Sequence, residues 1–172
     1  AAKSLVYHTA VDKIYFLIED DVFPSDLPEF IEVINVSNQT WFHQDGKNAK
    51  DHRTYMNLIR AALPKILSED VVLCLDNDTI VMDDISELWD IDLEQNYYAG
   101  VCEPVKSGWY PYINMGVSLH NLKLLRDGTC NKIIHALNTN YYVCPLQDSI
   151  YQFCKEHFLL IDGCYNVSKY TE

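Results

Sequence analysis

Apolar and polar positions are grouped in blocks along the chain, and these blocks predict strands interleaved with helices. β-branched and aromatic runs predict strands over residues 13–18, 30–36, 71–75, 97–101, 112–119 and 158–161. Helical spacing of apolar residues predicts helices over residues 4–8, 53–67, 83–89, 119–125, 131–137 and 147–157. Polar and proline- or glycine-containing stretches predict loops over 37–52 and 104–111. This alternation is typical of an α/β fold, so we expect a three-layer α/β/α sandwich with a central mixed, mostly parallel sheet.

The most informative stretch is Val71–Leu75, five apolar residues that run directly into Asp76, Asn77 and Asp78. Such a run predicts a buried central strand, and open α/β sheets bind ligands at the carboxyl ends of their strands. Asp76 and Asp78 are two residues apart, so on an extended chain they face the same side. Two adjacent carboxylates repel each other unless a cation or a proton lies between them, and oxygen ligands suit Mg²⁺ or Mn²⁺. The pattern predicts a metal site for a phosphorylated substrate, with an ordinary polar turn as the alternative.

Two further positions have a local signature. Arg60 lies among apolar residues of the helix predicted over 53–67, which Pro64 should end or kink. Its planar guanidinium suits either a solvated surface position or contact with a phosphate. Gly116 interrupts the strand predicted over 112–119, which indicates a β-bulge or a close approach of the backbone to another group.

Composition restricts the class of protein. With 172 residues, 48% of them hydrophobic, the chain is long enough for one domain, residues 1–172, with a substantial core. A net charge of −12 with scattered Lys and Arg argues against binding to nucleic acid or to an anionic membrane surface. No apolar run approaches the ~20 residues of a transmembrane segment. The six cysteines show no Cys-x-x-Cys spacing, which favours buried free thiols and a cytoplasmic location.

Several separated stretches resemble glycosyltransferase family 8, the family of glycogenin and the bacterial lipopolysaccharide galactosyltransferases. The most specific are Leu75-Asp76-Asn77-Asp78-Thr79-Ile80-Val81 followed by Ser86-Glu87-Leu88-Trp89, and Tyr112-Ile113-Asn114-Met115-Gly116-Val117 followed by Asn121-Leu122-Lys123. The resemblance implies the GT-A fold, a nucleotide-binding α/β sandwich. It also implies transfer of a hexose from a nucleotide sugar, usually UDP-linked, to an acceptor, with retention of configuration and with Mn²⁺ (or Mg²⁺).

The same resemblance implies roles for individual residues around the nucleotide. Asp76 and Asp78 match the Asp-x-Asp pair that holds the metal, and Asp76 also contacts the ribose or the sugar. A metal at this position would neutralise the charge that develops on the diphosphate leaving group. Arg60 matches a basic position at the donor site.

Other matches concern the transferred sugar and the acceptor. Asn114 matches an asparagine that touches the donor sugar, and Gly116 leaves room for that sugar. Gln147 matches the glutamine beneath the anomeric carbon, where a weak nucleophile favours attack by the acceptor on the face from which the leaving group departs. Asp148 is expected to orient the sugar. Glu103 falls where the family often has an acidic residue on the acceptor side.

The chain also departs from the family pattern. Leu146 replaces the acidic residue that usually precedes the glutamine, at a position that the resemblance associates with orientation of the donor sugar. We expect the chain to lack the first strand of the fold and a C-terminal segment that carries a metal-binding histidine and a basic diphosphate contact. The sequence does not identify the donor sugar, the acceptor, the third metal ligand or the oligomeric state.

Two alternatives stay open at this stage. Haloacid-dehalogenase-like phosphatases also place Asp-x-Asp-x-Thr after an apolar strand, with the first aspartate as nucleophile and the second as acid/base. That motif belongs near the start of their domain, whereas two predicted strands precede it here. The other alternative is a non-catalytic relative that binds a nucleotide sugar, which the presence of Leu146 favours.

Overall fold

The computed structural model describes residues 1–49, 54–103 and 111–167. Its backbone divides into two compact units, which we treat separately: the first is Ala1–Thr40 with Asn77–Ile91, and the second is Trp41–Asp76 with Asp92–Glu172. Most of the loop predicted over 104–111, the end of the loop predicted over 37–52 and the start of the helix predicted at Arg53 lie outside the described residues. The single catalytic domain expected over 1–172 stays a prediction.

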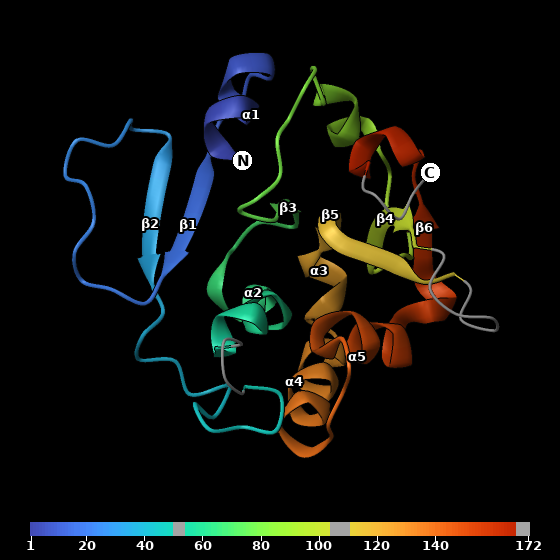
Figure 1. The fold of residues 1–172 in the computed structure, drawn as a ribbon. Coiled ribbons are helices and arrows are strands. Elements are labelled where there is room, and N and C mark those ends of the chain that lie inside the picture. The colour runs from blue at the N-terminus through green and yellow to red at the C-terminus, as the bar shows by residue number, and fades with distance from the viewer. Residues whose placement is uncertain (50–53, 104–110, 168–172) are drawn as a thin grey trace. The chain divides into compact units, whose positions relative to one another are not determined.

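The first unit contains the two predicted N-terminal strands as a parallel pair. β1 (Ile14–Ile18) pairs with β2 (Ile31–Asn35), with Ile14 opposite Ile31 (Figure 1). The helix α1 (Ala2–His8) precedes them and holds the segment that follows the Asp-x-Asp motif, because the Ser4 hydroxyl accepts a 3.0 Å hydrogen bond from the Val81 amide. Later in this unit a 3-10 helix, η3 (Ser86–Asp90), confirms the predicted short helix. The Asp84 carboxylate accepts the Ser86 amide at 2.9 Å just before this helix, whose N-cap residue is Ile85 and makes no capping bond through its side chain.

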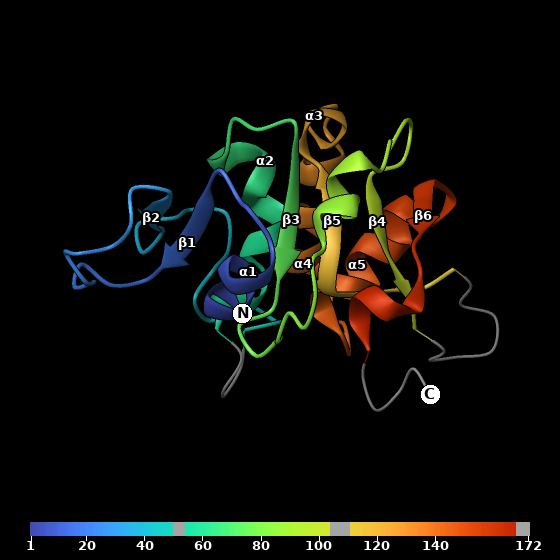
Figure 2. The same ribbon diagram turned by 90° about the horizontal axis from the view of Figure 1, so that it is seen from above.

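The second unit is built on a four-stranded sheet. Seen from above, its strands lie in the order β3 (Val71–Leu75), β5 (Ile113–Asn121), β4 (Tyr98–Cys102) and β6 (Phe158–Leu160) (Figure 2). β5 runs antiparallel to both of its neighbours, and β4 pairs with β6 in parallel. β3, β4 and β6 therefore run in one direction and β5 alone runs against them, so the sheet of this unit is mixed, as expected, with three of its four strands parallel to one another. The connection from β4 to β5 covers residues 103–112, and this is shorter than the dozen or so residues that a crossover between neighbouring parallel strands requires.

The strand before Asp76 is placed differently from the prediction. Among the described strands of the second unit, β3 lies at one edge of the sheet, and Val71 is 41% exposed. The two inner strands of this sheet are β5 and β4, in which seven of nine and four of five residues are buried. An apolar run shows that a strand packs against a core, but it does not show how many neighbours the strand has.

The predicted helix over 53–67 is interrupted. It consists of two 3-10 helices, η1 (Tyr55–Asn57) and η2 (Ile59–Ala62), followed by a short α-helix, α2 (Leu63–Ile66). Pro64 does not end a helix here but occupies the first turn of α2, where its missing amide hydrogen costs no hydrogen bond. The tighter turns still bury the predicted apolar face, including Ile59 and Leu63.

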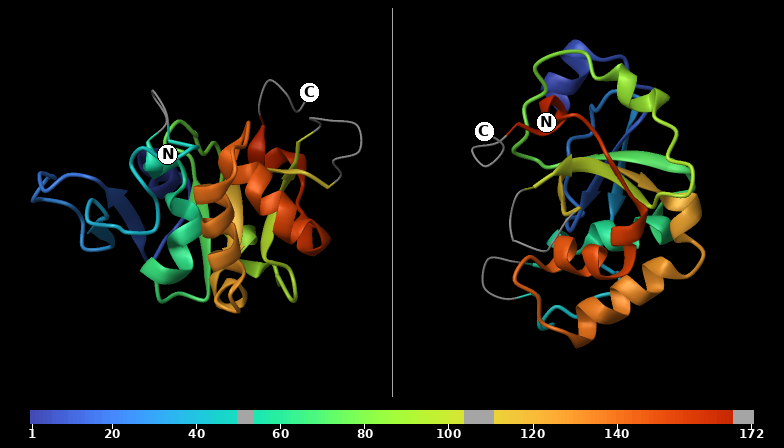
Figure 3. Two further views of the ribbon diagram at one scale, coloured as in Figure 1. Left: turned by 90° about the horizontal axis from the view of Figure 1, so that it is seen from below. Right: turned by 90° about the vertical axis from the view of Figure 1, so that its right-hand side faces the viewer.

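Three more helices complete the second unit: α3 (Leu122–Leu125), α4 (Thr129–Thr139) and α5 (Pro145–Cys154), the last continued by η4 (Lys155–His157). Figure 3 shows α4 and α5 against the same face of the sheet. Their inner side chains are fully buried, among them Ile133, Leu137 and Ile150. This confirms an α/β arrangement with one helical layer, while the three-layer architecture stays a prediction. No helix within the described ranges is long and apolar enough to cross a lipid bilayer.

A bulge interrupts the pairing of β4 with β5, as Gly116 predicted. Gly100 of β4 lies opposite Ser118, but Cys102, only two residues later, lies opposite Ile113. Four residues of β5, Asn114–Val117, therefore face a single residue of β4. A bulge of this kind bends the strand and redirects its side chains.

Candidate functional site

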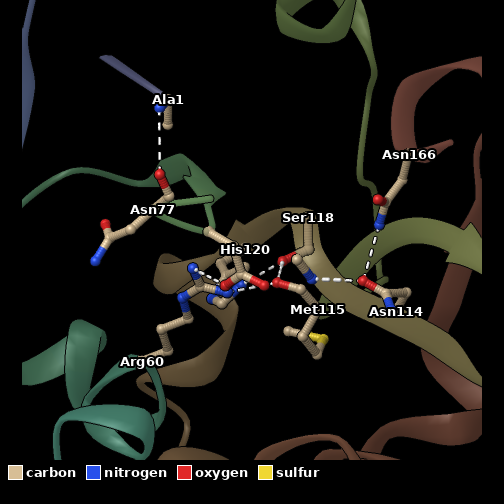
Figure 4. A network of polar contacts seen from close by, with 10 residues as sticks. Ala1, Arg60, Asn77, Asn114, Met115, Ser118, His120 and Asn166 are labelled. Atoms are coloured by element: carbon tan, nitrogen blue, oxygen red, sulfur yellow. Dashed lines mark hydrogen bonds and ion pairs between the residues drawn. The ribbon is translucent and has the colours of Figure 1, made fainter. Parts of the chain in front are cut away.

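An ion pair lies at the carboxyl end of β3. The Arg60 side chain extends from η2, and its Nη2 lies 2.7 Å from Oδ1 of Asp76. Its Nη1 donates to the Met115 carbonyl at 2.5 Å, so the guanidinium is held at two points (Figure 4). The Arg60 side chain is 19% exposed and that of Asp76 is 50% exposed. A nearly enclosed cation thus faces a carboxylate that solvent and a ligand can reach.

Gly116 brings the backbone of β5 next to this ion pair. The Asp76 amide donates to the Gly116 carbonyl at 2.7 Å. A Cβ atom added at Gly116 would lie 2.9 Å from Oδ2 of Asp76 and 2.9 Å from Oδ1 of Asn114. Any other residue would displace one of these two groups, so the predicted close approach is confirmed.

Asn114, which lies in the bulge, shares the carboxylate of Glu103 with a second amide side chain. Its Nδ2 donates to Oε2 of Glu103 at 3.0 Å. Gln147, in the first turn of α5, donates from Nε2 to the same oxygen, also at 3.0 Å. The structure thus joins three of the residues that sequence reasoning selected, although they lie far apart in the chain.

One member of this network was missed. Asn166, in the 3-10 helix η5 (Gly163–Asn166), donates from Nδ2 to Oδ1 of Asn114 at 2.8 Å (Figure 4). The sequence around it contains no strand or helix pattern that would indicate a position near Asn114. Only the fold, which brings η5 to the end of β5, shows its position.

Asp148 lies in a different environment from the other predicted residues. Its side chain is buried, and its two oxygens accept hydrogen bonds from the Tyr112 hydroxyl at 2.7 Å and from the Cys144 amide at 2.9 Å. The second bond closes the start of α5, where the backbone amides have no helical partner. Burial, together with the bond to Asp148, raises the pKa of Tyr112 well above its ordinary value.

Asp78 is the second residue of the predicted metal pair. It belongs to the first unit and its side chain is exposed, whereas Asp76 belongs to the second unit. The distance between the two carboxylates therefore stays a prediction. Within the described ranges, no three His, Cys, Asp or Glu side chains are grouped so as to hold a metal ion.

The donor chemistry nevertheless fits a divalent cation of the Mg²⁺ or Mn²⁺ type. Such ions bind carboxylate oxygens, and Mg²⁺ is commonly held by one or two carboxylates together with substrate phosphates. Asp76 and Asp78 supply carboxylates of this kind. The missing side chain of Gly116 leaves the space next to Oδ2 of Asp76 that a Cβ would fill.

A buried polar chain lies beneath the ion pair. Ser118 donates to the Met115 carbonyl at 3.3 Å, and its hydroxyl lies 2.9 Å from Nε2 of His120 (Figure 4). His120 is completely buried, and its Nδ1 has no hydrogen-bond partner among the described residues. Burial, with a smaller contribution from the Arg60 charge, lowers the pKa of His120 to about 3. A neutral imidazole at physiological pH avoids placing a second cation next to Arg60.

The comparison with protein families gives a direct result. The family model described as glycosyl transferase family 8 matches residues 1–172. The chain belongs to glycosyltransferase family 8. This confirms the resemblance found in the sequence and removes the phosphatase alternative.

Individual relatives agree with this assignment. Glycosyltransferase GlyE of Streptococcus pneumoniae serotype 4 (strain ATCC BAA-334 / TIGR4) is 31% identical over 133 residues, which cover 72% of this chain. The crystal structure of GlyE matches 96% of the chain with a TM-score of 0.69 and 27% identity. Galactosyltransferase LgtC, solved in complex with donor and acceptor sugar analogues, matches 78% with a TM-score of 0.59 and 24% identity, and supports the fold.

The chain is short relative to these proteins. The match covers 32% of the GlyE sequence, 42% of the GlyE chain in the crystal and 54% of the LgtC chain. The chain thus corresponds to about a third to a half of the length of these relatives.

Proposed function

We propose that this chain carries the donor site of a retaining glycosyltransferase, which moves a hexose from a nucleotide sugar, UDP-linked, to a saccharide, lipid-linked or protein acceptor. The observation that supports this most is the connected set of Arg60, Asp76, Gly116, Asn114 and Gln147. These residues come from four separate segments of the second unit, and each was selected from the sequence for a role at one donor sugar. A network with only a structural role would have no reason to join residues that were selected for one functional site.

Asp76 and Asp78 would hold Mn²⁺ or Mg²⁺, which supplies Lewis-acid stabilisation of the diphosphate leaving group when bound. Arg60 fixes the orientation of the Asp76 carboxylate and adds positive charge next to the phosphates. Gly116 leaves room for the sugar, and Asn114 donates a hydrogen bond to one of its hydroxyl groups. Gln147 lies beneath the anomeric carbon, and Glu103 lies on the acceptor side.

The test is a nucleotide-release assay. The protein is incubated with a panel of UDP- and GDP-sugars and Mn²⁺, and free nucleotide is measured. We expect release from one UDP-sugar, its loss in Asp78→Ala and a partial loss in Asn114→Ala. Near-normal turnover in Asp78→Ala would overturn the metal assignment, and no release with any donor would overturn the proposed activity.

A non-catalytic nucleotide-sugar-binding protein is the second candidate, and Leu146 is the observation that favours it. Leu146 is a half-buried apolar residue in the first turn of α5, directly before Gln147. Saturable binding of a UDP-sugar in a calorimetric titration, without release of UDP, would support this candidate.

The location of the protein belongs to the same proposal. We place it in the cytoplasm, where nucleotide sugars would be available as donors and where cysteine thiols stay reduced. All six cysteines lie in the described residues and none forms a disulfide. Burial raises the pKa of the Cys74 thiol to about 11, which keeps it protonated and unreactive next to Asp76.

A further inference from the structure

Two amide side chains converge on one carboxylate oxygen. Asn114 and Gln147 each donate to Oε2 of Glu103 at 3.0 Å, from the bulge of β5 and from the first turn of α5. Glu103 directly follows β4 and is half-buried. A carboxylate oxygen can only accept, so it requires that both amides turn their N–H groups toward it.

The orientation of Asn114 follows from its other contacts. Its Oδ1 accepts a hydrogen bond from the Gly116 backbone amide at 2.7 Å, and a backbone N–H can only donate. The atom that faces Gly116 is therefore the oxygen, and the NH₂ group must face Glu103. Asn166 lies 2.8 Å from the same oxygen, so it must present its own Nδ2.

The orientation of Gln147 follows from Glu103. Because its Nε2 is bound to the carboxylate, its Oε1 lies on the other branch of the planar amide and is directed away from Glu103. An amide is neutral, and its two orientations differ in energy mainly through such contacts. Without Glu103, the side chain could present N–H where the oxygen now lies.

We propose that Glu103 and Asn166 are positioning residues, which fix the amide orientations of Asn114 and Gln147 at the donor site. This proposal rests on the proposed function. The fixed orientation presents the Gln147 carbonyl oxygen, the negative end of the amide dipole, toward the sugar, where positive charge develops as the glycosidic bond breaks. It leaves the second N–H of Asn114 for a sugar hydroxyl. Asn166 acts only through Asn114.

Four variants separate positioning from ordinary packing: Glu103→Ala, Glu103→Gln, Asn166→Ala and Asn166→Asp. Asp is nearly isosteric with Asn but places an acceptor against Oδ1 of Asn114, which must then turn. A positioning role therefore predicts a greater loss of nucleotide release in Asn166→Asp than in Asn166→Ala. A packing role predicts the reverse order, because Ala leaves a cavity and Asp does not.

The first measurement is independent of activity. The side-chain NH₂ signals of Asn114 and Gln147 are recorded by ¹⁵N NMR in each variant. We expect both pairs of signals to move in Glu103→Ala, and only those of Asn114 to move strongly in Asn166→Asp. Asn138→Ala is the control, because Asn138 donates to the Trp41 carbonyl elsewhere in the second unit.

The second measurement is nucleotide release. We expect kcat to fall about 100-fold in Glu103→Ala, as for a misplaced catalytic group, while KM for the donor changes little. Glu103→Gln keeps an acceptor oxygen and should lose less. In the Asn114→Ala background, Asn166→Ala should cause no further loss.

The proposal would be overturned if the amide signals of Asn114 and Gln147 did not move in Glu103→Ala. It would also be overturned if nucleotide release fell further in Asn166→Ala than in Asn166→Asp. Absence of release from the unsubstituted protein contradicts the proposed function alone. In that case the amide signals still decide whether Glu103 and Asn166 orient the two side chains.

Discussion

Two carboxylates of the second unit lie in contrasting surroundings. The side chain of Asp76, at the end of β3, is 50% exposed and is paired with Arg60. Asp148, near the start of α5, is 7% exposed, and each of its oxygens accepts a hydrogen bond from within the protein. A ligand can therefore compete for Asp76, whereas binding to Asp148 would first have to break bonds to Tyr112 or to the Cys144 amide.

The contrast shows that membership of a sequence motif does not determine the role of a carboxylate. We expect Asp76 to bind the ligand and Asp148 to stabilise the folded protein. For Asp148 this favours support of α5, and so of Gln147, over direct contact with the sugar. Four predictions test the distinction.

The largest effect is expected for Asp76→Ala. The substitution removes the partner of Arg60 and a proposed metal ligand, so nucleotide release should fall about 10³-fold. Asp70→Ala is the matched control, because Asp70 is an exposed carboxylate just before β3, 3.5 Å from Lys123. Equal losses in the two variants would remove the special role of Asp76.

Asp148→Ala should mainly destabilise the fold. It removes the hydrogen bonds that Asp148 accepts from the buried Tyr112 hydroxyl and from the Cys144 amide, which should lower the free energy of unfolding by about 3 kcal/mol. Urea denaturation measures this. The control is Asp162→Ala, whose exposed carboxylate accepts the Cys164 amide at 2.9 Å, and its loss should lower the free energy of unfolding much less. If Asp148→Ala lost nucleotide release while its free energy of unfolding stayed unchanged, Asp148 would instead contact the ligand.

Acid should destabilise the region beneath Asp76 through His120. Its pKa is lowered from 6.5 to about 3, so below pH 6.5 the unfolded chain takes up a proton that the folded protein does not. Stability is therefore lost as the pH falls, by about 2 kcal/mol between pH 6.5 and pH 5. Urea denaturation at pH 6.5 and at pH 5 should show this loss of stability in the unsubstituted protein. The control His135→Gln, which changes an exposed histidine, should show the same loss, and His120→Gln a smaller one.

The smallest effect is expected for Tyr112→Phe. It removes a single hydrogen bond to Asp148 and should cost about 1.5 kcal/mol. Tyr142→Phe is the control, because the Tyr142 hydroxyl donates to Gln152 at an exposed site. If thermal denaturation shows the same small change in both variants, the bond between Tyr112 and Asp148 does not stabilise α5.

The sequence predicted the elements better than their arrangement. The spacing of Ile133, Ile134 and Leu137 predicted α4, and the β-branched run predicted β1. Strand direction depends on which strands meet, and the antiparallel pairing of β5 has no signature within its own residues. The 3-10 turns before Pro64 bury the same face as an α-helix would, so periodicity could not distinguish them.

For the site, the sequence identified the residues but not the bonds among them. Arg60 and Gly116 could be selected because a cation among apolar residues and a glycine within a strand are locally unusual. Asn166 is an asparagine in an irregular segment, which is common, so its contact with Asn114 could not be expected. The hydrogen bond from Tyr112 to Asp148 depends on the packing of α5, which no local sequence pattern specifies.

The bulge in β5 has a consequence for how such a site can change over time. Because the excess residues Asn114–Val117 face one residue of β4, exchanges within them leave the pairing of Leu119 with Ala99 in register. At the donor site that we propose, the preference for a sugar could therefore change within this short insertion without a change in the strands around it. Gly116 sets the boundary of that freedom, since a side chain there would collide with Asp76.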